Sequence, residues 1–232
     1  MKLKDAQGGI KPKAEALVLK SSFYNNPFVG MYFKASDQLA LAPSNAPVKV
    51  VELVERALGV PTVKLLLSQS NLLGLFSCMN SKGVVVTDLA EKAEVALLKK
   101  RGLNILLLEG LSPGNNVVAN DKAALVSSRV EKKDLRKIED CLGVEVFQHF
   151  FATPALITST IATNSGLLTH NEITETELKF LEKIFKVQGS QGTVNNGVPF
   201  NSLGAVANSK GAVVGDGTSG FETQRIFNAL FG

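Results

Sequence analysis

The stretch Asn208-Ser209-Lys210-Gly211-Ala212-Val213-Val214 carries a pattern that recurs along the whole chain. A polar tetrapeptide followed by an apolar run begins in the same way at Asn80, and variants begin at Asn120, Asn164 and Ser36. Successive starts are 44, 40, 44 and 44 residues apart. A recurrence of this length predicts a repeat protein with one supersecondary unit per period.

Each polar tetrapeptide is predicted to form the turn of a β-hairpin. An Asn at the first position of a type I turn can bond the backbone two residues on, and Gly is favoured at the fourth position. Apolar segments flank each turn, as the strands of a hairpin require. Six residues before each start stands a small residue: Gly30, Gly74, Gly114, Thr158 and Ser202.

A helix and a further strand are predicted between successive hairpins. Apolar residues at helical spacing, often followed by a Gly that can stop a helix, predict helices over residues 47–58, 88–101, 131–142, 174–186 and 219–231. Short extended segments then follow at residues 62–67, 104–108, 144–150 and 187–193. The predicted unit is therefore hairpin, helix, strand.

The fifth unit lacks a final strand, whereas the chain begins with an unassigned strand-like segment at residues 17–23. We expect this N-terminal strand to complete the fifth unit and close a five-fold pseudosymmetric α/β propeller. Closure removes open sheet edges that would invite aggregation. The alternative is an open α/β array with capped ends. Residues 16–232 are predicted to be one five-bladed domain, preceded by a basic, disordered extension at residues 1–15.

The composition is that of a soluble globular protein. Of the 232 residues, 45% are hydrophobic and 20% are charged, and no apolar run approaches the length of a membrane span. The net charge of +4 is mild: it is compatible with a nucleic-acid-rich partner but equally with solubility alone. Without a secretion signal, Cys78 and Cys141 are expected to be free thiols in a reducing, cytoplasmic compartment.

Several segments resemble the archaeal and eukaryotic translation initiation factor 6 family, and the match runs in order from about Leu17 to the C-terminus. The segments are residues 25–30, 114–121, 143–146, 192–195 and 207–214. The resemblance implies a closed five-bladed ring of the pentein type. It also implies a monomer that binds the large ribosomal subunit on its subunit-joining face and blocks association with the small subunit. Because the chain ends with its fifth predicted helix, the archaeal form is favoured.

The resemblance also implies the partners and the binding residues. The family contacts ribosomal protein uL14 chiefly, with the sarcin–ricin loop of rRNA nearby, and in eukaryotes it also serves in large-subunit maturation. By alignment, Gly114 and Asn115 fall on a Gly-Asn pair important for large-subunit binding, and Phe200 falls on an apolar position of the fifth unit.

Ser70 and Asn71 are assigned as the equivalents in the second unit, and Phe28 in the first. All six residues are expected in loops at the rim of the ring. The alternative is that Asn115 only tolerates a left-handed turn and that Phe200 packs into its own blade.

A rival interpretation is a guanidine-modifying enzyme, because the pentein fold also houses deiminases and amidinotransferases. Such enzymes need a Cys nucleophile, a His and carboxylates that converge. The chain offers only Cys78, Cys141, His149 and His170, and it has no Cys from Gly192 onward, where these enzymes carry theirs. The four residues also lack metal-ligand spacing. We therefore expect a protein that is not an enzyme and that uses neither a metal nor a cofactor.

Overall fold

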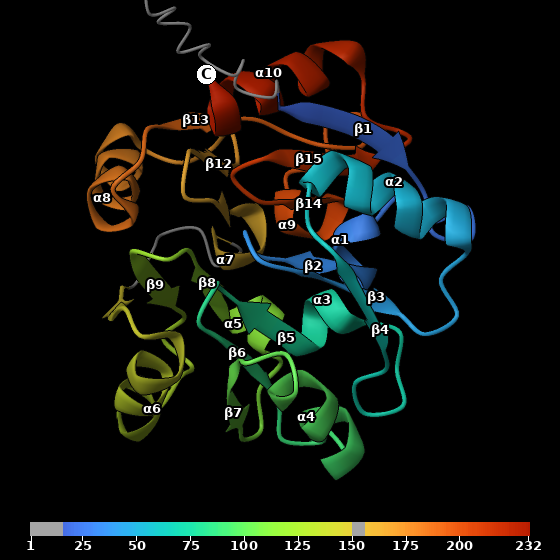
Figure 1. Cartoon of the computed structure of the whole chain (residues 1–232). Helices are drawn as coiled ribbons and strands as arrows, with labels where there is room; N and C mark the ends of the chain where they lie inside the picture. The colour runs from blue at the N-terminus through green and yellow to red at the C-terminus, as the bar shows by residue number, and fades with distance from the viewer. Residues whose placement is uncertain (1–15, 150–155) are drawn as a thin grey trace, which may run out of the picture.

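The computed structural model describes residues 16–149 and 156–232, so the predicted extension at residues 1–15 lies outside it. Five three-stranded sheets are each accompanied by an outer helix (Figure 1). We number the sheets as units 1 to 5 in chain order. Unit 1 contains β2 (Lys34–Ala35), β3 (Ala40–Pro43) and β4 (Thr62–Leu65), unit 2 contains β5 (Ser77–Met79), β6 (Gly83–Thr87) and β7 (Asn104–Leu108), and unit 3 contains β8 (Val117–Ala119), β9 (Ala123–Val126) and β10 (Glu145–Gln148). Unit 4 contains β11 (Ile161–Ala162), β12 (Leu167–Thr169) and β13 (Gly189–Gln191), and unit 5 contains β14 (Ala205–Ala207), β15 (Gly211–Gly215) and β1 (Leu17–Ser21).

Every sheet has the same topology, and it agrees with the predicted unit. The first two strands pair antiparallel as a hairpin, and the middle strand pairs parallel with the outer strand. A parallel pair needs a long crossover connection, which in units 1 to 4 the outer helix supplies. The outer helices are α2 (Val48–Leu58), α4 (Lys92–Lys99), α6 (Lys132–Leu142), α8 (Glu175–Phe185) and α10 (Gly220–Phe231).

The helix predicted over residues 88–101 is shorter than expected. It begins at Lys92 because Glu91 and Glu94 form a capping box, in which each side chain accepts the backbone N–H of the other. The apolar residues ahead of it, Leu89 and Ala90, belong to the preceding turn. Hydrophobic spacing alone could not separate them from the helix.

The prediction for the fourth turn is wrong by one residue. The turn begins at Thr163, whose hydroxyl accepts the N–H groups of Ser165 at 3.2 Å and Gly166 at 3.0 Å. Asn80 does the same with its side-chain oxygen in unit 2, at 3.0 and 3.1 Å. A Thr hydroxyl can accept the same two N–H groups as an Asn side chain. Because the prediction looked for Asn at the start of each turn, it placed the turn at the neighbouring Asn164.

The prediction that the N-terminal strand completes the fifth unit is confirmed. β1 pairs parallel with β15, from Leu17 opposite Gly211 to Ser21 opposite Gly215. Units 5 and 1 are also joined by Asn208, whose Nδ2 donates to the carbonyl oxygens of Ser36 at 3.0 Å and Leu58 at 2.9 Å.

Five four-residue helices were not predicted, since they are too short to show a period. They are α1 (Val29–Tyr32), α3 (Leu73–Phe76), α5 (Pro113–Asn116), α7 (Leu156–Ser159) and α9 (Asn201–Gly204). Each contacts the next, and α9 contacts α1, so the contacts run in a cycle. In Figure 1 they lie between the five outer helices. We call this group the collar.

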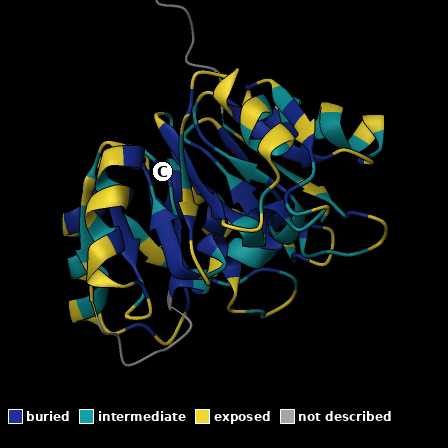
Figure 2. Ribbon diagram, turned by 90° about the horizontal axis from the view of Figure 1, so that it is seen from below, coloured by how far each residue is buried: buried dark blue, intermediate teal, exposed yellow. Residues whose placement is uncertain are grey.

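All residues of the five middle strands are buried. Figure 2 shows buried strands in the interior and the exposed residues mainly on helices and loops. The apolar cluster beneath α2 contains Ala40 of unit 1 together with Val213 of unit 5, so neighbouring units share a core. A unit therefore cannot bury its apolar surface alone, which is typical of repeat proteins. Among the described residues, no helix is both long and apolar enough to cross a membrane.

The chain topology gives the molecule two different faces. On one, the hairpins turn, the outer helices end and the outer strands begin; we call it the turn face. On the other, the outer helices begin, the outer strands end, and loops lead from them into the collar; we call it the loop face.

Candidate functional site

The collar on the loop face is held by close backbone contacts. A β-carbon on Gly74 would overlap the carbonyl oxygen of Gly30, and one on Gly114 would overlap that of Gly74. In unit 5 a Ser fits, and the hydroxyl of Ser202 donates a 2.7 Å hydrogen bond to the carbonyl of Thr158. The predicted small residues are thus required by packing. They lie in the collar, and this includes Gly114, which was predicted in a loop at the rim.

Three loops of the loop face reverse direction through residues with left-handed backbone. A tight turn of this kind favours Asn and Gly, because most other side chains are strained there. The residues and their φ angles are Tyr24 (48°), Asn25 (64°), Ser68 (55°), Gln69 (57°), Asn195 (49°) and Asn196 (63°). The reversals project short, stiff tips from the face.

Two of these loops are fastened by a glutamate in the first turn of the following outer helix. Glu94 of α4 accepts the N–H of Ser68 at 2.8 Å, and Glu222 of α10 accepts those of Asn196 at 3.1 Å and Gly197 at 2.8 Å. Each glutamate also closes the capping box of its own helix. One carboxylate therefore ties the loop to the helix.

Glu222 has a strongly perturbed pKa. Burial alone would raise it, but hydrogen bonds from the backbone of Ser219 and Gly197 and from the hydroxyls of Thr193 and Ser219 outweigh burial and lower the pKa to about 2. The carboxylate is therefore charged at neutral pH, and its oxygens accept the hydrogen bonds that hold the loop.

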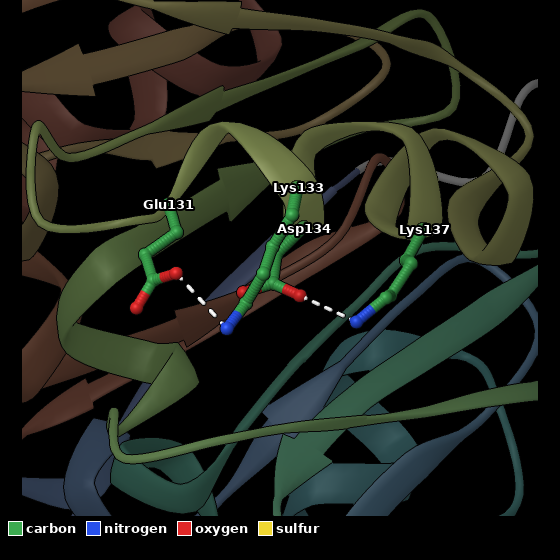
Figure 3. A network of polar contacts seen from close by, with 4 residues as sticks. All are labelled: Glu131, Lys133, Asp134 and Lys137. Carbon is green, nitrogen blue, oxygen red and sulfur yellow. Dashed lines mark hydrogen bonds and ion pairs between the residues drawn. The ribbon is translucent and has the colours of Figure 1, made fainter.

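Unit 3 is fastened differently (Figure 3). Asp134 holds the equivalent position in α6, but its shorter side chain accepts the ammonium of Lys137 at 2.8 Å, while Glu131 pairs with Lys133 at 2.9 Å. The loop that leads to α5 is instead held by a long 3.4 Å bond from the N–H of Gly110 to Asp88. The loop before Asn115 therefore has a longer carboxylate anchor than the loops of units 2 and 5, although Asn116 also donates to the carbonyl of Ser112 at 2.9 Å.

Two of the six predicted site residues are exposed on this face. Asn115 is exposed on α5 and donates its backbone N–H to the carbonyl of Ser112. Its backbone is helical, so the alternative of a left-handed turn at Asn115 is wrong. Phe200 is 39% exposed at the N-cap of α9. Phe28, which is half-buried, occupies the same position before α1 with nearly the same φ and ψ.

The other three predicted site residues are buried or half-buried within the collar and the loops that lead to it. Gly114 is buried against Gly74. Ser70 is the counterpart of Asn26 and not of Gly114: both close a left-handed turn and accept the N–H two residues on. Asn71 is half-buried, and its side-chain oxygen lacks a hydrogen-bond partner in the part of the chain that the structure describes.

Most of the exposed apolar side chains were not among the residues predicted from the sequence. Besides Phe200, the loop face carries four large exposed side chains: Tyr24 (63%), Val48 (67%), Leu89 (66%) and Phe221 (70%). Val48 and Phe221 lie near the N-terminus of their helices and outside the row of apolar residues that the helix buries. An apolar residue outside that row is the sequence signal that could have identified them as exposed. Five large exposed apolar side chains on one face of the molecule make that face the candidate binding surface.

The two thiols considered for catalysis are buried in the interior, whereas the two histidines follow the ends of β10 and β12 on the loop face. Burial raises the pKa of both thiols, that of Cys141 to about 11, so both are protonated at neutral pH and are poor nucleophiles. Burial also lowers the pKa of His170, whose Nδ1 accepts the N–H of Glu172 at 3.0 Å. The His149 ring lies 4.7 Å from that of Phe180. Within residues 16–149 and 156–232, no group of three or more His, Cys, Asp or Glu side chains could hold a metal.

Comparison with known proteins gives a consistent family. Residues 18–229 match the model of the eIF-6 family. A translation initiation factor 6 of Thermococcus onnurineus is 36% identical over 221 residues, and one of Pyrococcus horikoshii is 33% identical over 217 residues. These alignments cover 91% and 90% of this chain, and 96% of each relative.

One solved structure shows a weak likeness. A dimethylarginine dimethylaminohydrolase, as its adduct with S-methyl-L-thiocitrulline, matches with a TM-score of 0.42 at 9% sequence identity. The match covers 82% of this chain and 80% of that one. A likeness at this level supports no inference about activity.

Proposed function

The chain belongs to the eIF-6 family, and we propose that it acts in translation initiation by binding the large ribosomal subunit and blocking association with the small subunit. Within the structure, one observation supports this most: five large apolar side chains, from units 1, 2 and 5, are exposed on the loop face. The partners that we propose there are ribosomal protein uL14 and the neighbouring rRNA, including the sarcin–ricin loop.

The proposed mechanism is steric exclusion. A protein bound where the small subunit must dock makes the two binding events mutually exclusive, so occupancy alone suffices. A stable contact buries about 1,200–2,000 Å² in total. The close-packed collar and the carboxylate-anchored loops limit the entropy lost on binding, because little of the surface has to be ordered.

We propose that Asn115 and Phe200 make direct contacts in this interface. Asn115 offers an exposed amide, and Phe200 offers a partly exposed ring at the entrance of α9. Phe28, Ser70 and Asn71 contribute through the shape of their loops, and Gly114 contributes by allowing α5 to approach α3.

The first experiment tests the function itself. Purified large and small subunits are mixed with increasing amounts of the protein and separated on a sucrose gradient. We expect the joined-ribosome peak to fall as the protein saturates the large subunit. An unchanged peak at saturation would contradict the proposed function.

The second experiment tests the face. We expect Asn115→Ser and Phe200→Asp each to weaken large-subunit binding by about 1–2 kcal/mol, or about 5- to 30-fold in Kd, without lowering the melting temperature. The matched control is Leu17→Asp, because Leu17 is as exposed as Phe200, at 39%, but lies at the start of β1 on the turn face. Equal binding by all three variants would remove the loop face from the proposal.

A further inference from the structure

A groove of about 1010 Å³ opens on the turn face, where unit 5 meets unit 1. Its walls come from the C-terminal ends of α2 and α10, the start of β1, and the turns of units 4 and 5. The lining residues that matter here are Leu17, Arg56, Lys210, Phe227 and Phe231.

The groove follows from the topology of the fifth unit. In units 1 to 4 a short connection leads from the end of the outer helix to the start of the outer strand. In unit 5 the outer strand β1 precedes the hairpin in the chain, so α10 and β1 are not consecutive. No residue that the structure describes fills the corresponding space between α10 and β1.

The floor of the groove is apolar. Phe227 and Phe231 lie one helical turn apart on α10, with ring centroids 5.8 Å from each other, and both are only partly buried. Leu17 adds a side chain that is 39% exposed. Partly exposed rings in a concave site provide anchoring pockets for apolar side chains.

The rim of the groove is cationic. Arg56 and Lys210 are both exposed, and neither forms an ion pair within the described residues. The ammonium of Lys210 donates to the carbonyl oxygens of Asp37 at 3.1 Å and Gly59 at 3.4 Å, while the carboxylate of Asp37 accepts the N–H and hydroxyl of Ser209.

We propose that this groove binds an acidic segment of a partner protein, which inserts apolar side chains between α2 and α10 and sets its carboxylates against Arg56 and Lys210. Binding of an amphipathic helix in an apolar groove is a recurrent mode of peptide recognition. Because the groove lies on the turn face, such a partner can bind while the loop face is occupied. The assignment does not depend on what the loop face binds.

Two other occupants fit the chemistry less well. Residues 1–15 precede Ala16 at the groove, but they carry Lys2, Lys4, Lys11 and Lys13 against Asp5 and Glu15, so their charge has the same sign as that of the rim. Single-stranded RNA would match the cations. However, aliphatic Leu17 and the concave shape suit inserted side chains better than stacked bases.

The experiment uses the full chain and three fluorescein-labelled 14-residue peptides in anisotropy titrations. The first peptide carries Leu and Phe four residues apart among Glu and Asp, the second replaces the acids by Lys, and the third replaces Leu and Phe by Ala. We expect saturable binding of the first peptide alone, weakened by added salt. Arg56→Glu and Phe227→Ser should each weaken it at least about tenfold.

Matched variants control for general effects. Lys183→Glu changes an exposed cation near the end of α8, and Leu107→Ser removes an exposed apolar side chain of β7; both should bind like the wild type. All variants should melt within a few degrees of the wild type. Equal binding by all four variants, or absence of saturation with the acidic peptide, overturns the proposal.

Two further outcomes would reassign the groove. Stronger binding of a poly(U) oligonucleotide than of the acidic peptide, lost in Arg56→Glu, would identify an RNA site. At least tenfold tighter peptide binding after deletion of residues 1–14 would identify that segment as the native occupant. Either result contradicts a partner protein as the primary ligand.

Discussion

On the turn face, one side chain makes the same four hydrogen bonds in units 2, 3 and 5, whereas on the loop face most exposed residues differ between units, although Phe28 and Phe200 occupy the same position in units 1 and 5. Asn80, Asn120 and Asn208 each accept two N–H groups of their own turn and donate to two carbonyls of the next unit. The exposed residues of the loop face range from Tyr24 to Asn115 and Phe221.

The difference shows where each kind of constraint acts. A buried amide that must satisfy four backbone groups can be replaced only at a cost in stability, so the repeat is preserved where it joins the units. An exposed loop residue is under no such requirement once its backbone is anchored. The loop face is therefore free to carry different contacts in each unit.

The most severe test of this comparison is Asn120→Ala. The substitution leaves the carbonyls of Thr163 and Phe185 and two turn N–H groups without their partner, in a buried environment. We expect the free energy of unfolding to fall by about 3 kcal/mol in urea titrations. Asn115→Ala on the loop face should change it by less than about 0.5 kcal/mol. Similar losses for the two would erase the distinction between the faces.

A smaller effect is expected from Glu222→Gln, which tests a loop-face residue with a structural role. At neutral pH the loss should be about 2 kcal/mol, because a charge-assisted anchor of four donors is weakened. Since the folded pKa of about 2 lies below the ordinary 4.5, the wild-type carboxylate stabilises fully above about pH 4.5 and progressively less as the pH falls toward 2.

The difference in unfolding free energy between wild type and Glu222→Gln should therefore shrink from about pH 5 to about pH 2. Denaturant titrations at several pH values measure it. The exposed Glu175→Gln on α8 serves as the control and should show little pH-dependent difference. A constant difference for Glu222→Gln would mean that its charge does not hold the loop.

The smallest effect is expected in unit 4, where Thr163 replaces the Asn that begins the turn in units 2, 3 and 5. Thr163 has no amide to reach unit 5, and the hydroxyl of Ser165 donates instead to the carbonyl of Leu230 at 2.7 Å. We expect Thr163→Asn to stabilise the protein by about 1 kcal/mol by restoring a bond between units. Thr163→Val, which loses the turn acceptor, should destabilise it. A loss of stability in Thr163→Asn would show that Ser165 already completes this junction.

Most of the fold could be predicted because its signals are local. The Asn turns and the apolar rows of the helices are each visible within one repeat, and their recurrence in successive repeats strengthens the prediction. The N-terminal strand is recognised because the fifth repeat lacks a final strand. The shift at Thr163 was missed because a hydroxyl and an amide can accept the same two N–H groups. The collar helices were missed because four residues do not display a helical period.

The candidate site was predicted less well, because exposure depends on neighbours far apart in the chain. Asn115 and Phe200 are exposed, but Gly114 is buried by Gly74 of another unit. The aromatic and aliphatic side chains Tyr24, Val48, Leu89 and Phe221 resemble core residues in sequence. Only the arrangement of the neighbouring units shows that these side chains face solvent and not an apolar core.

The sequence by itself determined the number of units, their hairpin–helix–strand order and the pairing of the N-terminal strand with the last unit. These depend on turn chemistry and on the side-chain periods of helices and strands, which a chain carries with it. The tertiary structure alone decided which face gathers the exposed apolar side chains, which carboxylate fastens which loop, and where a groove is left open. Those features arise between units, from contacts that exist only after distant segments have packed together.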